Sequence, residues 1–540
     1  MSELAIRSTP AAAAGRPNLE DTPHAATLPV FLLLLVAGLG YAVYGLLSDM
    51  NSVGEQPLAL GAFILLGIAL LIALGFEFVN GFHDTANAVA TVIYTHSLSP
   101  VVAVIWSGVF NFLGVVVSTG AVAYSIVTLL PVELILQVGS AAGYAMIFAL
   151  LIAAIIWNLG TWALGLPNSS SHALIGSVIG VGLANQLLSP HGQATSGVDW
   201  GQAVNVLEAL LFSPAVGFVF AGLLLLAMKL VVRNRKLYES PDGRHPPPWW
   251  IRGLLILTCT GVSFAHGGND GQKGMGLIML ILIGAAPTAF ALNRTMSESA
   301  TPHFVQTTQQ AQAVFQAYAD GAPAPSLDSA RQLLNERLRT KDLNHPEVFA
   351  ALAALSGDIG KEVQGYGAVR RVPAAATPNL RNSMYLTADA VRLLPKAGVT
   401  LSADETKALG EYDQSLNAGT RYIPTWVKVS VAVALGLGTM VGWKRIVVTV
   451  GEKIGKQHLT YAEGASAELV AAGTIGLAEV YGLPVSTTHI LSSGVAGAMA
   501  ANGSGLQWAT VRNMATAWVL TLPAAITLSG VLYAILRQVF

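Results

Sequence analysis

Two short polar stretches, GLPNSSSH at 165–172 and GLPVSTTH at 482–489, lie in surroundings that are otherwise strongly apolar. Each combines a Gly-Leu-Pro turn with three hydroxyl residues and a histidine. Hydroxyls donate hydrogen bonds without carrying a permanent charge, and the free N–H groups at a helix N-terminus attract anions. We expect Pro167 and Pro484 to begin a helix in each case, because proline is favourable in the first helical turn. The pattern predicts an anion-binding turn that occurs twice.

The hydroxyl residues of these turns are the expected anion ligands. Two helix ends of this kind, approaching from opposite faces of a membrane, can enclose one tetrahedral oxyanion. The alternative interpretation is that the hydroxyls only cap helices or join neighbouring ones, which is common in membranes; two matched copies favour anion binding. His172 and His489 either orient the turns or titrate, and the sequence leaves both roles open. The expected ligands are Ser169, Ser170, Ser171, Ser486, Thr487 and Thr488.

Two further segments, EFVNGFHDTANAVATVIYTHSL at 77–98 and SFAHGGNDGQKGMGLIMLILIG at 263–284, place a carboxylate and several glycines inside apolar stretches. Ionisable groups are costly inside a membrane, so they indicate function by default. A helix would put Asp84 and Asn87 on one face, and likewise Asp270 and Lys273. The alternative is a buried structural Asp–Lys or Asp–His pair. We expect a helix broken at the glycines in each segment.

The elements that must position these residues follow from the composition. Of 540 residues, 53% are hydrophobic and only 11% are charged, against about 25% in soluble proteins. A net charge of −1 argues against nucleic-acid binding, and the single Cys259 excludes an intrachain disulfide and a multi-cysteine metal site. Apolar runs about 20 residues long predict a polytopic α-helical membrane protein. The runs are 29–47, 57–79, 101–130, 145–164, 205–232, 426–443 and 513–536.

Charge asymmetry predicts the orientation. Lysine and arginine gather in residues 229–252 and 444–456, which we therefore assign to the cytoplasm. The connections 48–56, 131–142 and 187–204 contain neither residue and fit the opposite side. This path gives a cytoplasmic N-terminus and a C-terminus on the opposite side. We expect 29–47 to be an uncleaved helix and not a signal peptide, because no A-x-A site follows it.

The same order of segments occurs twice, and the two copies start from opposite faces, as in transporters built from inverted repeats. The predicted fold is an all-α polytopic membrane protein with two inverted-topology repeats, each with a broken helix and a re-entrant helical hairpin. The expected division is a disordered tail at 1–28, an extra transmembrane helix at 29–47, repeat 1 at 57–232 with its hairpin at 143–186, the first part of repeat 2 at 249–289, an extramembrane insert at 290–425, and the rest of repeat 2 at 426–540 with its hairpin at 464–502.

Four motifs together resemble the inorganic phosphate transporter (PiT) family, and most closely its bacterial low-affinity branch: NGFHDTANAVATVIYT, GLPNSSSH, HGGNDGQKGMGLIML and GLPVSTTHILSSGVAGAM. The resemblance covers 57–290 and 426–540. It implies a multi-pass protein of the bacterial inner membrane that takes up inorganic phosphate by secondary active symport and alternating access. In such a membrane, the orientation predicted from charge puts the insert and the C-terminus in the periplasm. By the same resemblance, Asn87 and Asn269 join the hydroxyl turns as phosphate ligands.

The sequence departs from the N-D-x-x-N pattern of the sodium-dependent members. His83 precedes Asp84, and Lys273 stands where the second repeat would have an amide. A fixed cation there replaces a sodium ligand, and histidine titrates in the physiological range. We therefore assign ion or proton coupling to Asp84, Asp270, His83 and Lys273, with protons as the expected coupling ion and sodium as the alternative.

Several alternatives stay open at this stage. The chain could carry phosphate as a neutral complex with a divalent metal, or another oxyanion such as sulfate, or it could be an anion channel. The lipid bilayer is its surroundings, and a homo-oligomer remains open. No resident cofactor or metal is expected. An enzyme is not expected, because the sequence holds no nucleophile–base set and no G-x-x-x-x-G-K-[ST] motif.

Overall fold

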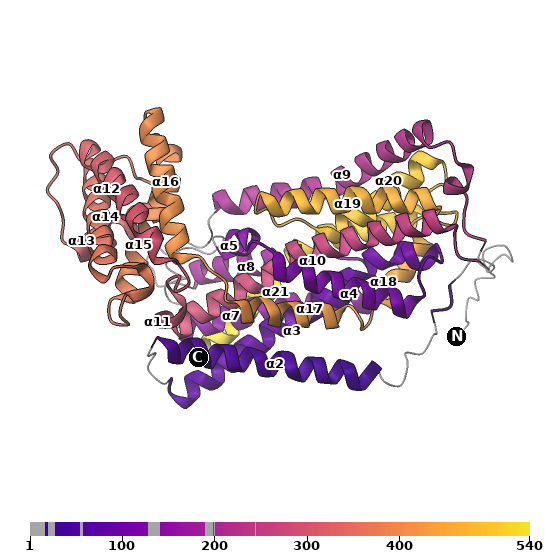
Figure 1. Ribbon diagram of the computed structural model, residues 1–540, viewed down its shortest axis with the longest axis horizontal. Coiled ribbons are helices and arrows are strands. Elements are labelled where there is room, and N and C mark those ends of the chain that lie inside the picture. The colour runs from indigo at the N-terminus through magenta and orange to yellow at the C-terminus, as the bar shows by residue number, and fades with distance from the viewer. Residues whose placement is uncertain are drawn as a thin grey trace.

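The computed structural model describes residues 17–19, 27–53, 58–127, 141–188, 198, 200–242 and 245–540, apart from the side chains of 85–87, 141 and 202. These residues form helices and connecting segments, with no strand among them, as expected for an all-α protein. Most of the long helices run side by side in one bundle (Figure 1). The bundle helices are α2 (Thr27–Ser52), α3 (Leu60–Tyr94), α4 (Pro100–Val117), α5 (Ala121–Val127), α7 (Ala141–Ala163), α8 (Ser170–Leu187), α9 (Trp200–Val231), α10 (Trp249–Ala285), α17 (Thr425–Gly438), α18 (Lys444–Val448), α19 (Tyr461–Val480), α20 (Thr487–Asn502) and α21 (Trp508–Val539).

Several of these helices suit a bilayer by length and composition. Within the described ranges, six are long and apolar enough to cross a membrane, namely α2, α3, α4, α7, α9 and α21. The multi-pass membrane class predicted from composition fits this finding. The predicted run 101–130 divides into α4 and α5, because the chain turns at Ser118 and at Gly120, whose φ is +90°.

Contacts between helices occur in matched pairs across the two halves of the chain. Helix α9 packs on α20 as α21 packs on α8, and α4 packs on α10 as α17 packs on α3. Helices α3 and α10 also contact each other directly. Because α3 carries Asp84 and α10 carries Asp270, this contact brings the two membrane carboxylates into the same part of the bundle.

The prediction that each helix carrying a membrane carboxylate is broken at its glycines is wrong. Helix α3 is continuous through Asp84, and α10 is continuous through Asp270. The glycines serve close packing instead. A Cβ on Gly267 would collide with the backbone oxygen of Asn111 on α4, and one on Gly81 would collide with the backbone oxygen of Leu435 on α17. The glycines thus let neighbouring helices approach closely without interrupting the helical hydrogen bonds.

The segment between α10 and α17 forms a second group of helices at one end of the bundle (Figure 1). This insert has its own hydrophobic core, which includes Phe304, Phe315, Leu355 and Leu416. Its helices, after the short α11 (Pro287–Phe290), are α12 (Thr301–Tyr318), α13 (Leu327–Thr340), α14 (Pro346–Tyr366), α15 (Thr377–Leu393) and α16 (Ala403–Thr420).

The two ends of the insert lie side by side where they join the bundle. The backbone N–H of Asn293 donates to the carbonyl of Gly419 at 2.8 Å, and the Asn293 side chain donates to the carbonyl of Ala418 at 2.8 Å. The Tyr422 hydroxyl donates to the carbonyl of Ala289 at 3.2 Å. We call this pair of hydrogen-bonded chain segments, 289–293 and 418–422, the neck of the insert.

Candidate functional site

The two octapeptides fold into matching turns between α7 and α8 and between α19 and α20. Gly165 and Gly482 both adopt the left-handed conformation, with φ values of +66° and +65°. The N–H of Leu166 then bonds back to the carbonyl of Thr161, and that of Leu483 to the carbonyl of Ala478. This is the ordinary way in which glycine ends a helix.

The second helix of each pair begins at a hydroxyl residue. The Ser169 hydroxyl accepts from the N–H of His172, and the Ser486 hydroxyl accepts from the N–H of His489, so both serines are N-caps. Pro167 and Pro484 precede the helices and do not begin them, which corrects the expectation, because serine accepts the N–H bond that proline cannot. The other four hydroxyl residues lie in the first helical turn as predicted: Ser170, Ser171, Thr487 and Thr488.

The first turns of α8 and α20 meet at one carboxylate. Ser170 Oγ donates to Asp84 Oδ2 at 2.9 Å, and Thr488 Oγ1 donates to Asp84 Oδ1 at 2.6 Å. His83 Nδ1 lies 3.1 Å from Oδ1 of the same carboxylate, and its Nε2 lies 3.3 Å from the Thr161 hydroxyl. Asp84 is 3% exposed, so these hydroxyls and the imidazole surround a carboxylate that is almost completely buried.

A second charged pair lies beside the first turn of α8. Lys273 Nζ is 2.6 Å from Asp270 Oδ1, and both side chains are fully buried. Lys273 also donates to the Ser171 hydroxyl, which in turn donates to the carbonyl of Val485 at 2.9 Å. The ammonium group therefore links α10 to the α8 turn, and Ser171 links the two turns to each other.

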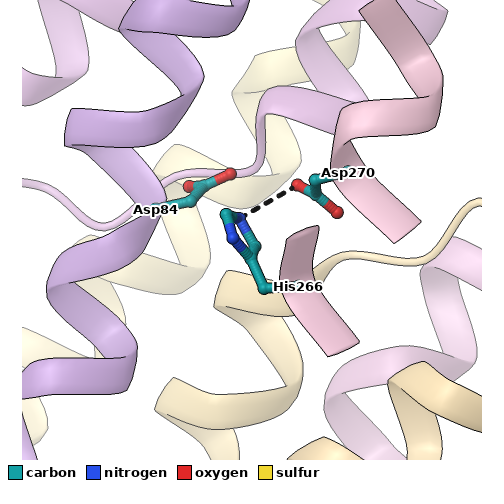
Figure 2. Close-up of side chains that lie close together, drawn as sticks. All are labelled: Asp84, His266 and Asp270. Carbon is teal, nitrogen blue, oxygen red and sulfur yellow. Dashed lines mark ion pairs between the residues drawn. The ribbon is translucent and has the colours of Figure 1, made fainter. Parts of the chain in front are cut away.

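The two carboxylates converge with a histidine (Figure 2). Ligand atoms of Asp84, His266 and Asp270 all lie within 4.8 Å of one another, and all three residues are buried. His266 Nδ1 donates to Asn111 Oδ1 at 2.7 Å, while Nε2 lies 3.4 Å from Asp270 Oδ2. Two carboxylate oxygens and one imidazole nitrogen are a donor set that suits a divalent metal ion.

The remaining expected ligands differ from one another in their hydrogen-bond partners. Asn269 donates to the carbonyl of Leu483 at 3.1 Å, while its side-chain oxygen is buried. Among the side chains that the structure describes, neither this oxygen nor the buried Thr487 Oγ1 has a hydrogen-bond partner. The side chain of Asn87 lies outside the described residues. The rings of His172 and His489 lie close together, with centroids 4.5 Å apart and their planes tilted by 40°.

Two buried residues near this cluster were missed in the sequence. His266 precedes Asp270 by one helical turn, and that spacing is the signal that could have identified it. Glu77 is fully buried on α3, and it lies against Gly274 of α10, one residue beyond Lys273. Within the described part of the chain, its Oε1 has no hydrogen-bond partner. Nothing in the sequence around Glu77 predicts this neighbour, because the contact depends on how α3 crosses α10.

Comparison with known proteins adds independent information. A model described as the phosphate transporter family matches residues 80–529. The chain is 44% identical to the low-affinity inorganic phosphate transporter PitA of Escherichia coli (strain K12) over 492 residues, which cover 87% of this chain and 96% of PitA. It is 41% identical to PitB of the same organism, over 89% of this chain and 99% of PitB. A solved structure titled as a sodium-dependent phosphate transporter matches 88% of this chain and 100% of its own, at 20% identity and a TM-score of 0.49.

Proposed function

The chain belongs to the phosphate transporter family, as its motifs predicted, and from that premise we propose that it is a secondary active transporter that takes up inorganic phosphate together with protons. The relatives named above are transporters and not enzymes, in agreement with the prediction from sequence. The observation that carries the proposal is the meeting of two hydroxyl-bearing helix ends at the Asp84 carboxylate.

Phosphate binding would use the groups that now hold Asp84. Ser170 and Thr488 donate to its two oxygens, and each hydroxyl can instead donate to a phosphate oxygen. The free N–H groups at the starts of α8 and α20 would add donors and a positive helix end. Asp84 could then accept the hydrogen bond of a phosphate O–H. Sulfate stays dianionic and offers no such donor, so this arrangement favours phosphate.

Coupling to protons would rest on a cation that is part of the chain. The Lys273 ammonium lies 2.6 Å from Asp270 and donates to Ser171, so it supplies positive charge beside the turn. A sodium ion would otherwise have to bring that charge. His83 contacts Asp84 and Thr161, and histidine is the side chain that changes protonation most readily near neutral pH.

A divalent metal would travel as cargo with the phosphate. Asp84, His266 and Asp270 offer the donor atoms for it, and Asn111 fixes the orientation of the His266 ring. Binding of the metal would compete with Lys273 for Asp270. Transport of a neutral metal–phosphate complex would lower the charge that has to cross the apolar bundle.

Alternating access would follow from inverted repeats. In this proposal repeat 1 comprises 57–232, repeat 2 comprises 249–289 and 426–540, and the hairpins 143–186 and 464–502 are re-entrant. The matched helix contacts support it, since α9 on α20 corresponds to α21 on α8. Helix α7 is long enough to span a membrane, so the depth of the first hairpin is a specific point to test. The insert and the C-terminus would face the periplasm, and the N-terminus the cytoplasm.

The test is phosphate uptake by the purified protein in proteoliposomes, with pH and sodium gradients imposed separately. We expect saturable uptake that rises under an inward proton gradient and ignores sodium. Uptake that needs sodium and is insensitive to a protonophore would overturn the proton coupling but leave phosphate transport standing. Preference for sulfate over phosphate would overturn the assignment of the substrate.

A further inference from the structure

A small hollow lies where the insert meets the bundle, outside the cluster around Asp84 and Asp270. Arg381 and Tyr385 of α15 line it from the insert, together with Arg421, which follows α16. Tyr124 of α5 and Ile283 of α10 line it from the bundle. At about 1.5 Å per residue, Ile283 lies about 20 Å along α10 from Asp270. The hollow is therefore near the end of the helix that leads to the central site.

Arg381 is the least compensated charge in this hollow. It is 6% exposed, and within the described ranges it makes no hydrogen bond or ion pair with an acidic group. Its guanidinium carbon lies 5.3 Å from the centre of the Tyr385 ring. Burial lowers the pKa of the Arg381 side chain, because withdrawal from water disfavours the charged form. A buried guanidinium in such a place favours an anion as its partner.

The other polar groups of the hollow point to the same kind of ligand. The guanidinium carbon of Arg421 lies 5.4 Å from the centre of the Tyr124 ring, and the Tyr124 hydroxyl is buried with no hydrogen-bond partner among the described residues. Asp413 offsets part of the Arg421 charge, since the two interact electrostatically, and the Asn417 side chain donates to Asp413 at 3.0 Å. Nearby Arg392 is already paired with Asp389. The net result is a positive pocket with an additional hydroxyl donor.

We propose that Arg381 and Arg421 form a capture site for a phosphate oxyanion at the junction of the insert and the bundle, distinct from the central site. The hollow has a volume of about 20 Å³, room for about one water-sized group. It therefore takes one phosphate oxygen between the two guanidinium groups, and the rest of the ion stays at the mouth. Arginine suits this task, because its planar group donates two parallel bonds to an oxyanion. The site rests on the proposed function and on an insert that faces the side of uptake.

The structural alternative is that each arginine only joins the insert to the bundle by stacking on a tyrosine ring. Kinetics separate the two roles. A capture site acts on the encounter with phosphate, so its loss raises the KM for external phosphate and leaves the maximal rate unchanged. A purely structural contact lowers the maximal rate or the thermal stability and leaves KM unchanged.

The experiment compares Arg381→Gln and Arg421→Gln with Arg371→Gln in proteoliposome uptake. Arg371 lies on the exposed surface of the insert, where it pairs with Glu298 and does not line the hollow, so its replacement removes the same charge outside the proposed site. Arg381→Gln should raise KM about tenfold, as expected for loss of a hydrogen bond to a charged partner, with the maximal rate within about twofold of the wild type. Arg421→Gln should raise KM less, because Asp413 already offsets part of its charge. Arg371→Gln should match the wild type.

Two results would overturn the capture site while leaving phosphate transport intact: an unchanged KM in both variants, or a lower maximal rate at an unchanged KM. If Arg381→Gln does not fold, Arg381→Lys, which keeps the charge, and Arg421→Gln decide the question in the same assay. Absence of saturable uptake by the wild type would instead contradict the proposed function itself.

Discussion

Ser170 and Thr488 lie in the first turns of two helices from opposite halves of the chain, and they donate to the two different oxygens of a single carboxylate, Asp84. Such a contact requires both helix ends to be aimed at the same point inside the bundle. The symmetry extends beyond this contact, since Ser169 and Ser486 cap the two helices in the same way. The predictions below test what this convergence does.

Replacing hydroxyls of the turns should weaken phosphate binding. Ser170→Ala and Thr487→Ala each remove a donor from the first helical turn, and a hydrogen bond to a charged partner is worth about 1.5–3 kcal/mol. We expect at least a tenfold loss of affinity, measured by equilibrium binding of labelled phosphate to the purified protein. Ser177→Ala is the matched control, because the Ser177 hydroxyl donates to the carbonyl of Ala173 on its own helix and lies outside the first turn. Wild-type affinity in both turn variants would remove these turns from the site.

Replacing Lys273 by asparagine should change the coupling ion. The variant loses the ammonium next to Asp270 and gains a neutral oxygen that can bind sodium. We expect weaker stimulation by a proton gradient and the appearance of sodium stimulation in proteoliposome uptake. Lys444→Asn makes the same chemical change at an exposed position on α18. Removing one member of a buried ion pair costs about 3–5 kcal/mol, so size-exclusion profiles must first show that the variant is folded. A folded Lys273→Asn protein with wild-type proton coupling would contradict the assigned role.

The glycines of α10 should be intolerant of even a methyl group where another helix crosses. Gly267→Ala would drive a Cβ into the backbone oxygen of Asn111, and overpacking of this kind costs about 1–3 kcal/mol. Gly253→Ala lies on the same helix with open space around its Cβ position. We expect a lower unfolding temperature for Gly267→Ala and an unchanged or slightly higher one for Gly253→Ala. Equal unfolding temperatures for the two variants would contradict this prediction, because they would show that α4 and α10 can move apart to make room for a methyl group without loss of stability.

The proposed orientation predicts which cysteines react with a membrane-impermeant thiol reagent on intact cells. After Cys259→Ser removes the background, Ala194→Cys and Glu336→Cys should be labelled, whereas Ser240→Cys should be labelled only after the membrane is permeabilised. Glu336 tests the side of the insert directly, because it is exposed on α13. The reverse pattern would invert the orientation, although the relation between the two repeats could survive it.

Much of the site's geometry could be predicted because helix ends are encoded locally. A glycine that can adopt positive φ, followed by proline and serine or threonine, specifies where one helix ends and the next begins. The helix starts at 169–171 and 486–488 could therefore be predicted from sequence, while the role of these residues as phosphate ligands stays a prediction. Their meeting at Asp84 could be expected only from the repeat of the motif. The unbroken course of α3 and α10 could not be predicted, because glycine in an apolar run is as typical of close helix packing as of a break. The Asn111–His266 contact depends on tertiary packing, and no local sequence pattern predicts it.

The neck of the insert makes this protein unusually easy to re-engineer. Because Asn293 is hydrogen-bonded to Gly419 and Ala418, the chain leaves the bundle and returns to it at nearly one point. A short flexible linker could therefore bridge the gap if the intervening residues were excised, at a small cost in loop-closure entropy. The same point is a natural graft position for a foreign domain whose own termini are adjacent, such as a fluorescent reporter. Replacing the insert by another domain at this junction would leave the order and direction of the bundle helices unchanged.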